Sequence, residues 1–297
     1  MPAVTVPRAH GPDATAENLL TMLVVVAICI LAAGYGRGVH ELWYRRGAGA
    51  VLPAWRVGAF GAGVLVVLAA DQGPVHTLAE SSFAGHMAQH MLLLLVAGPL
   101  LAAGAVGLPL SLATPPALRR LLAHCRAAPP VRRLRRPTTY ALLAGAVQVA
   151  MLWFWHLPGP YVAAVDRPVV HAVEHLCLLG SAWLFWAPLL GPARHRPPAP
   201  LTVLLLVGTM LPASALGAVL TFAPAPVYPV RVLGSDPLTD QQLAGLLMWA
   251  PMDVVVLVVA LGVFLRWLLR MDRPDNQPPA AAARPVTVEA GSEGTAR

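Results

Sequence analysis

Long apolar stretches, each long enough to cross a membrane, dominate this sequence. A helix that spans the hydrocarbon core of a bilayer needs about 20 predominantly apolar residues. The stretches that meet this length are Leu19–Tyr35, Leu52–Ala70, His86–Val106, Tyr140–Leu157, Val170–Leu190, Leu201–Phe222 and Leu243–Leu269. Charged residues make up only 12% of the chain, whereas a soluble domain has about 25%. We therefore expect an all-α fold, a polytopic membrane bundle of about seven transmembrane helices.

The arginines predict the orientation of this bundle. All 21 basic residues other than histidine are arginines, and most lie in alternate connections between the apolar stretches. The arginine-rich connections and the C-terminal end hold Arg37, Arg45, Arg46, Arg119, Arg120, Arg126, Arg132, Arg133, Arg135, Arg136, Arg194, Arg196, Arg266, Arg270 and Arg273. The other connections hold only Arg167 and Arg231 against several carboxylates. Because basic connections stay in the cytoplasm, we predict the N-terminus outside and the C-terminus inside.

The ends of the chain differ in composition from the membrane domain, which we predict to cover residues 18–273. Residues 1–17 are predicted to form an extracytoplasmic tail, and Asp13 and Glu17 there argue against a cleaved signal peptide, which begins with basic residues. Residues 274–297 are rich in proline and alanine and predict a disordered cytoplasmic tail. The arginines form no aromatic-interleaved patch, so we expect the lipid bilayer and no nucleic acid as a partner.

Five histidines are predicted to lie at one depth, near the outer face of the membrane. His86 and His90 begin the third stretch, His156 ends the fourth, and His171 and His175 begin the fifth. Each of the two pairs has i,i+4 spacing, which places both rings on one face of a helix. Ionisable groups in spanning segments are costly and usually functional. We therefore predict that the five rings form a metal site, although a structural role as polar anchors stays open.

Other side chains near the same depth have the chemistry to support a metal site. Imidazole nitrogens bind zinc, copper, iron and nickel. The carboxylates of Asp71, Glu174 and Asp240 can each orient an imidazole by accepting its second N–H. Met248, one to two turns into the last stretch, adds a soft thioether that favours Cu(I). We therefore predict copper, with zinc as the alternative.

Four short motifs, in this order along the chain, resemble one protein family. They are HMAQHMLLLL from His86, FWHLPGPY from Phe154, HAVEH from His171 and DQQLAGLLMW from Asp240. Together they resemble the multi-helix CtaG-type assembly factors of bacterial cytochrome c oxidase, which are associated with caa-type oxidases. The resemblance covers roughly residues 71–270.

This resemblance implies a multi-pass protein of the bacterial cell (inner) membrane that is not an enzyme. Its expected function is to help a haem-copper oxidase mature by assisting copper delivery or insertion. The expected partners are cytochrome c oxidase subunits and an extracytoplasmic copper donor. On this interpretation His86, His90, His171 and His175 form a transient copper site, with His156 nearby.

Three other functions also fit the residues. HAVEH matches the HxxEH pattern of inverted zinc peptidases, which predicts a zinc-dependent membrane hydrolase that uses His171, Glu174 and His175, with the glutamate as base. A haem held between histidines of the third and fifth helices would make the protein a b-type cytochrome. A metal-free scaffold for oxidase subunits would use the histidines only as structural groups.

Overall fold

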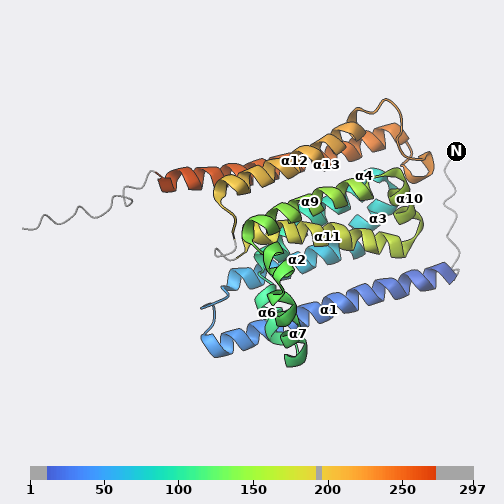
Figure 1. Cartoon of the computed structure of the whole chain (residues 1–297). Coiled ribbons are helices and arrows are strands. Elements are labelled where there is room, and N and C mark those ends of the chain that lie inside the picture. Colours follow the sequence, from blue (N-terminus) through green and yellow to red (C-terminus); the bar gives the residue numbers. More distant parts are fainter. Residues whose placement is uncertain (1–11, 192–195, 272–297) are drawn as a thin grey trace, which may run out of the picture.

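The computed structural model describes residues 12–191 and 196–271, with side chains from residue 18 onward, and these residues form helices and loops without a strand. Seven helices are long and apolar enough to cross a membrane, which confirms the predicted all-α polytopic fold. The spans are α1 (Pro12–Arg46), α2 (Ala54–Gln72), the continuous run of α4 (Phe83–Met91), η1 (Leu92–Ala97) and α5 (Gly98–Ala103), then α9 (Pro137–Trp155), α11 (Pro168–Leu190), α12 (Ala199–Phe222) and α13 (Pro237–Met271) (Figure 1).

Short helices join the spans at both ends of the bundle. At one end lie α3 (Pro74–Ser81), α10 (Pro158–Asp166) and the 3₁₀ turn η3 (Val230–Val232). The connection between the third and fourth spans contains α6 (Gly107–Ala113), α7 (Pro116–Ala127) and α8 (Pro129–Leu134). Several of these helices begin with proline, which fits the first turn because its missing N–H has no helical partner there.

The histidine-bearing and arginine-rich parts of the chain lie at opposite ends of the bundle. In Figure 1 α3, α4 and α10 gather at the end where α1 begins, whereas the last turns of α1 and α13 lie at the other end. Arginines occupy both of those last turns. The predicted cytoplasmic tail, residues 274–297, lies outside the described residues, as do residues 1–11 of the predicted N-terminal tail.

The first helix is longer than its apolar stretch predicts. The sequence predicts a loop after Tyr35, but α1 continues to Arg46. Glu41 and Arg45 form an ion pair at i,i+4 spacing on this extension. Such pairs stabilise a helix, and arginines in the last turn interact favourably with the helix dipole. The extra turns place Arg37 and Arg45 on one rigid helix.

A π-helical segment interrupts the third span two residues after His90. The segment η1 lies between α4 and α5, and the N–H of Gly98 donates to the carbonyl of Leu93 five residues earlier. Pro99 follows directly; it has no N–H to donate, and its ring crowds the preceding turn. The helix is therefore wider in the turn before Pro99. It changes the direction in which α4 presents its histidines relative to α5.

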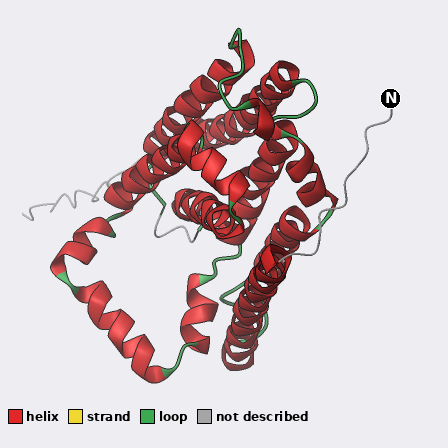
Figure 2. Ribbon diagram, turned by 90° about the vertical axis from the view of Figure 1, so that its right-hand side faces the viewer, coloured by secondary structure: helices red, strands yellow, loops and turns green. Residues whose placement is uncertain are grey.

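The last two spans pack closely through glycines. α12 and α13 run side by side along the length of the bundle (Figure 1). Figure 2 shows the structure turned by 90°, with the bundle of long helices and the shorter helices around it. Gly217 of α12 and Gly245 of α13 meet at this interface. Small residues let the backbones of membrane helices approach closely, and close packing drives helix association in lipid.

Substituting alanine for Gly245 is expected to lower stability. Its methyl carbon would lie 2.6 Å from the carbonyl oxygen of Gly217 and from the amide nitrogen of Thr221. Because these are backbone atoms, the two helices must separate, and overpacking of this kind costs about 1–3 kcal/mol. Thermal unfolding in detergent, followed by circular dichroism, measures the effect.

Gly262→Ala is the matched control, since Gly262 also lies in α13 and a Cβ there meets no heavy atom within 4 Å. We expect its unfolding temperature to be unchanged or raised, because alanine favours a helix more than glycine does. Equal unfolding temperatures for the two variants would contradict the close-packing interpretation.

Candidate metal centre

The five predicted histidines come together at the end of the bundle where α4, α9 and α11 meet. The ring centroids of His86 and His171 are 5.1 Å apart, and those of His90 and His175 are 5.3 Å apart. His156 follows the last residue of α9, and its ring lies 5.7 Å from that of His90. Except for the half-buried His171, all of these residues are buried. The i,i+4 pairs therefore face each other across two helices, as the site hypothesis requires.

The local sequence determines where each helix that carries a histidine pair begins. α4 starts at Phe83, and Ser82 caps it by accepting a hydrogen bond from the N–H of Gly85 at 3.0 Å. α11 starts at Pro168, so His171 lies in its first turn and His175 in its second. Both pairs consequently lie near the starts of their helices, which run in the same direction across the bundle.

Glu174 lies inside the cluster and joins the group with metal-ligand geometry. Ligand atoms of His86, His171, Glu174 and His175 all lie within 4.8 Å of one another. Atoms around one tetrahedral ion with bonds of about 2.1 Å are roughly 3.4 Å apart. The Nε2 of His86 is already 3.5 Å from one carboxylate oxygen, and the Nε2 of His90 is 3.7 Å from the other. A small contraction of the group is enough to bind an ion.

Most of the polar atoms that meet here have no hydrogen-bond partner. The carboxylate of Glu174 is fully buried and neither of its oxygens accepts a hydrogen bond. The Nε2 atoms of four histidines are buried without a partner as well: His86, His90, His171 and His175. A buried polar atom without a partner costs about 1–3 kcal/mol. Such atoms from two helices around one point have the chemistry of a cation site.

Asp71 orients one of the rings. Its Oδ1 lies 2.8 Å from the Nδ1 of His175, which leaves the Nε2 of that ring facing the other ligand atoms. A carboxylate behind a histidine is the usual support for a metal ligand, because it fixes the ring and raises its basicity. The predicted position of Asp71 behind an imidazole is therefore the one that the structure shows.

His156 lies beside a thioether at the inner side of the cluster. Its Nδ1 is 2.6 Å from the carbonyl oxygen of Leu152, and its Nε2 is 3.2 Å from the Sδ of the buried Met87. Because a carbonyl oxygen can only accept a hydrogen bond, Nδ1 carries the proton of this ring. With the proton on Nδ1, the lone pair of Nε2 faces the sulfur. Nitrogen and sulfur lone pairs that face each other form a soft donor pair.

Asp240 binds backbone groups rather than an imidazole, and Met248 packs in the core. Asp240 accepts hydrogen bonds from the backbone N–H groups of Phe83 and Ala84, at 2.7 and 3.0 Å, and from that of Gly234 at 2.7 Å. It therefore holds the start of α4 rather than a ring. Met248 is buried in the apolar core of the bundle.

His76 lies at the edge of the cluster and was not among the predicted site residues. It lies in α3, its ring stacks at 6.3 Å from that of His171, and its Nδ1 is buried without a partner. Its Nε2 is 3.8 Å from Glu80, which has i,i+4 spacing. The i,i+4 spacing of His76 and Glu80, which begins five residues after Asp71, is the feature of the sequence that indicates a short helix beside the site.

The loop between α12 and α13 contacts the residues of the site. This contact was not predicted from the sequence. The hydroxyl of Tyr228 donates to the carbonyl of His156 at 2.7 Å. Further along the loop, Arg231 forms a two-pronged ion pair with Asp166 of α10, at 2.6 and 2.9 Å. This hydrogen bonding lowers the pKa of the exposed Asp166 carboxyl. The pair fastens the loop to the helix that leads into α11.

Comparison with families of known proteins gives one result. Residues 33–270 match the family model described as cytochrome c oxidase caa3 assembly factor (Caa3_CtaG). The matched range includes every residue of the cluster and confirms the resemblance that the four motifs indicate. No curated protein and no solved structure gives a significant match.

Proposed function

Since this chain belongs to the family of cytochrome c oxidase caa3 assembly factors, we propose that it serves oxidase assembly by receiving copper at its histidine cluster and passing it on. The chain is a multi-pass membrane protein. We place it in the bacterial inner membrane with its arginine-rich end in the cytoplasm. The cluster then faces outward, where an extracytoplasmic copper donor and the maturing oxidase subunits can reach it.

One feature of the site supports this proposal above all. Imidazole nitrogens and carboxylate oxygens converge in a buried position where they lack hydrogen-bond partners. Histidines that only anchored the helices to the interface would have partners in protein or water. A cation would supply a partner to the ligand atoms of His86, His171, Glu174 and His175, which lie within 4.8 Å of one another.

The ligand types suit a cargo ion that must leave again. None of the three cysteines belongs to the cluster, so no thiolate holds the ion. The His156–Met87 pair adds a nitrogen and a thioether sulfur 3.2 Å apart. Soft thioether donors favour Cu(I) over zinc, so this pair is the reason that we propose copper.

The position of Glu174 weighs against a zinc hydrolase. In the HxxEH mechanism the glutamate stays off the metal and takes a proton from the bound water. Here both Glu174 oxygens face imidazole nitrogens of α4, at 3.5 and 3.7 Å. The glutamate thus lies among the ligands, where it cannot also act as a free base.

The test is a metal analysis of the protein purified in detergent without a histidine tag. After loading with Cu(I) under reducing conditions, copper, zinc and iron are measured by mass spectrometry. We expect about one copper per wild-type chain and almost none when His86, His90, His171 and His175 are all replaced by alanine. In cells, His86→Ala with His175→Ala is expected to reduce both the copper content and the amount of assembled oxidase.

His40→Ala with His124→Ala is the matched control, because both histidines are exposed and lie at the arginine-rich end. This variant is expected to bind copper like the wild type. Zinc in place of copper would favour the hydrolase, and haem iron would favour the cytochrome. No metal in the wild type after loading would leave the scaffold as the better account.

A further inference from the structure

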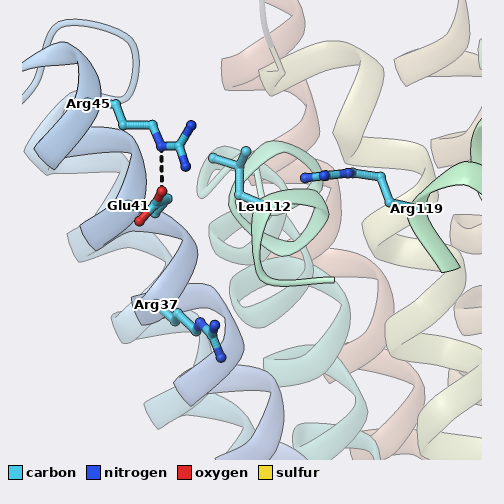
Figure 3. Close-up of a pocket in the computed structure, with 5 residues that line it drawn as sticks. All are labelled: Arg37, Glu41, Arg45, Leu112 and Arg119. Carbon is cyan, nitrogen blue, oxygen red and sulfur yellow. Dashed lines mark hydrogen bonds and ion pairs between the residues drawn. The ribbon is translucent and has the colours of Figure 1, made fainter. Parts of the chain in front are cut away.

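A cleft lined by arginines lies at the end of the bundle opposite the histidines. It has a volume of about 250 Å³ and lies between α1, α6 and α7. Its walls are formed by Arg37, Glu41 and Arg45 of α1, Leu112 of α6 and Arg119 of α7. Figure 3 shows the side chains of Arg45 and Arg119 reaching toward each other from opposite walls, with Leu112 between them.

The cleft carries excess positive charge. Of its charged residues three are arginines and one is a glutamate, and Glu41 pairs with Arg45 alone. Among the described residues, no other carboxylate lines the cleft to pair with Arg37 or Arg119. Like charges that share a cleft repel each other, and an anion between them removes the repulsion. The planar fork of arginine matches the oxygens of a phosphate group, to which it can donate two parallel hydrogen bonds.

The helix that provides Arg119 has the character of a helix that lies on a membrane. Leu118, Leu121 and Leu122 are exposed and follow helical spacing along one side of α7. Arg119, Arg120 and Arg126 lie on the same helix. An amphipathic helix with basic residues and exposed leucines lies in the interface plane and is attracted to anionic lipids. In Figure 1 α6 and α7 extend from the bundle beside α1.

We propose that this cleft binds the phosphate group of an anionic phospholipid headgroup. Phosphate chemistry alone would also fit a free phosphate ion, but the apolar side of α7 and Leu112 give acyl chains a surface next to the charge. Basic pockets beside spanning helices on the cytoplasmic side bind lipid headgroups, and α1 is the spanning helix of this cleft. The site is separate from the histidine cluster and does not depend on copper.

Thermal unfolding of the delipidated full-length protein in detergent tests this site. Phosphatidylglycerol, phosphatidylcholine or inorganic phosphate is added, and native mass spectrometry counts the retained lipids. Phosphatidylglycerol is expected to raise the unfolding temperature of the wild type, whereas the other two have little effect. Arg37→Gln with Arg119→Gln is expected to weaken lipid binding by about 100-fold, since each lost charged contact accounts for about tenfold.

Arg266→Gln with Arg270→Gln is the matched control, with the same change in charge on exposed residues of α13. It should bind phosphatidylglycerol like the wild type. Glu41→Gln removes the one carboxylate that lines the cleft and is expected to tighten binding, a gain that misfolding does not produce.

Three results would each overturn the proposal. Phosphatidylcholine could protect as well as phosphatidylglycerol, or the control pair could lose binding as much as the cleft pair. The third result is full protection by inorganic phosphate with no further effect of lipid, which would assign the cleft to a free anion.

Discussion

Replacing Glu174 with glutamine is expected to remove most of the stabilisation that copper gives the wild-type protein. The same change is expected to leave the metal-free protein at least as stable as before. Glu174 is fully buried, and its oxygens accept no hydrogen bond. A buried carboxylate without donors is costly to fold, whereas a neutral amide of the same shape has a lower cost of burial. With the ion bound, the carboxylate instead supplies the negative charge of the ligand set.

The size of the effect follows from binding linkage. An ion that binds only the folded protein stabilises it by about 2.7 kcal/mol when its free concentration is about 100 times the Kd. Removing a group that supports a metal ligand weakens affinity by about 10–100-fold, and we expect the upper end for a carboxylate within the ligand set. At the same copper concentration, a site weakened about 100-fold retains only about 0.4 kcal/mol. Unfolding with and without copper measures both numbers.

Glu80→Gln is the control for this substitution. Glu80 is an exposed carboxylate of α3 that lies near the cluster, 3.8 Å from His76, but outside the ligand group. It is expected to keep the full stabilisation by copper. A Glu174→Gln protein that still binds the ion tightly would contradict the ligand role. If that protein had also lost a zinc-dependent hydrolysis shown by the wild type, Glu174 would be a catalytic base.

The fold and the assembly of the histidines could be predicted because both depend on simple periodic patterns. Apolar stretches of membrane length predicted the spans to within a few residues, except at both ends of α1 and at the start of α13. The i,i+4 spacing of His86/His90 and of His171/His175 placed each pair on one helical face. Alternating charge then put both pairs at the same depth. These inferences need only the rise of a helix and the thickness of a bilayer.

Contacts between segments far apart in the sequence could not be predicted in the same way. The sequence placed Glu174 behind the rings, but packing of α11 against α4 turns its carboxylate into the group of ligand atoms. Likewise Asp240 was expected to hold an imidazole, and instead it holds the backbone of α4. Which groups a side chain contacts depends on how one helix is rotated against another. The spacing of residues within a single helix does not specify this rotation.

Replacing Asp240 with alanine is the second change with a large expected effect. Its main expected effect is a lower free energy of unfolding. Its carboxylate accepts hydrogen bonds from three backbone N–H groups, two of them in the first turn of α4. The first N–H groups of a helix have no partner within the helix. Leaving such donors buried and unpaired costs about 1–3 kcal/mol each. Because part of this cost is relieved by relaxation, we expect a loss of about 3 kcal/mol.

The substitution is also expected to displace a metal ligand, because α4 carries His86 one turn after the residues that Asp240 holds. Asp240→Ala should therefore unfold more easily without metal and bind copper more weakly. Glu174→Gln should change only the second property. The two variants thus separate a residue that positions a helix from a residue that contacts the ion.

Asp236→Ala is the matched control, because Asp236 also binds groups at the start of a helix but is exposed. It accepts hydrogen bonds from the hydroxyl of Thr239 at 2.8 Å and from its N–H at 3.4 Å. Loss of such a cap costs about 1 kcal/mol and should leave copper affinity unchanged. If Asp240→Ala resembled this control in both stability and copper affinity, the start of α4 would not depend on Asp240. The position of His86 would then have to be maintained by the packing of α4 against its neighbours.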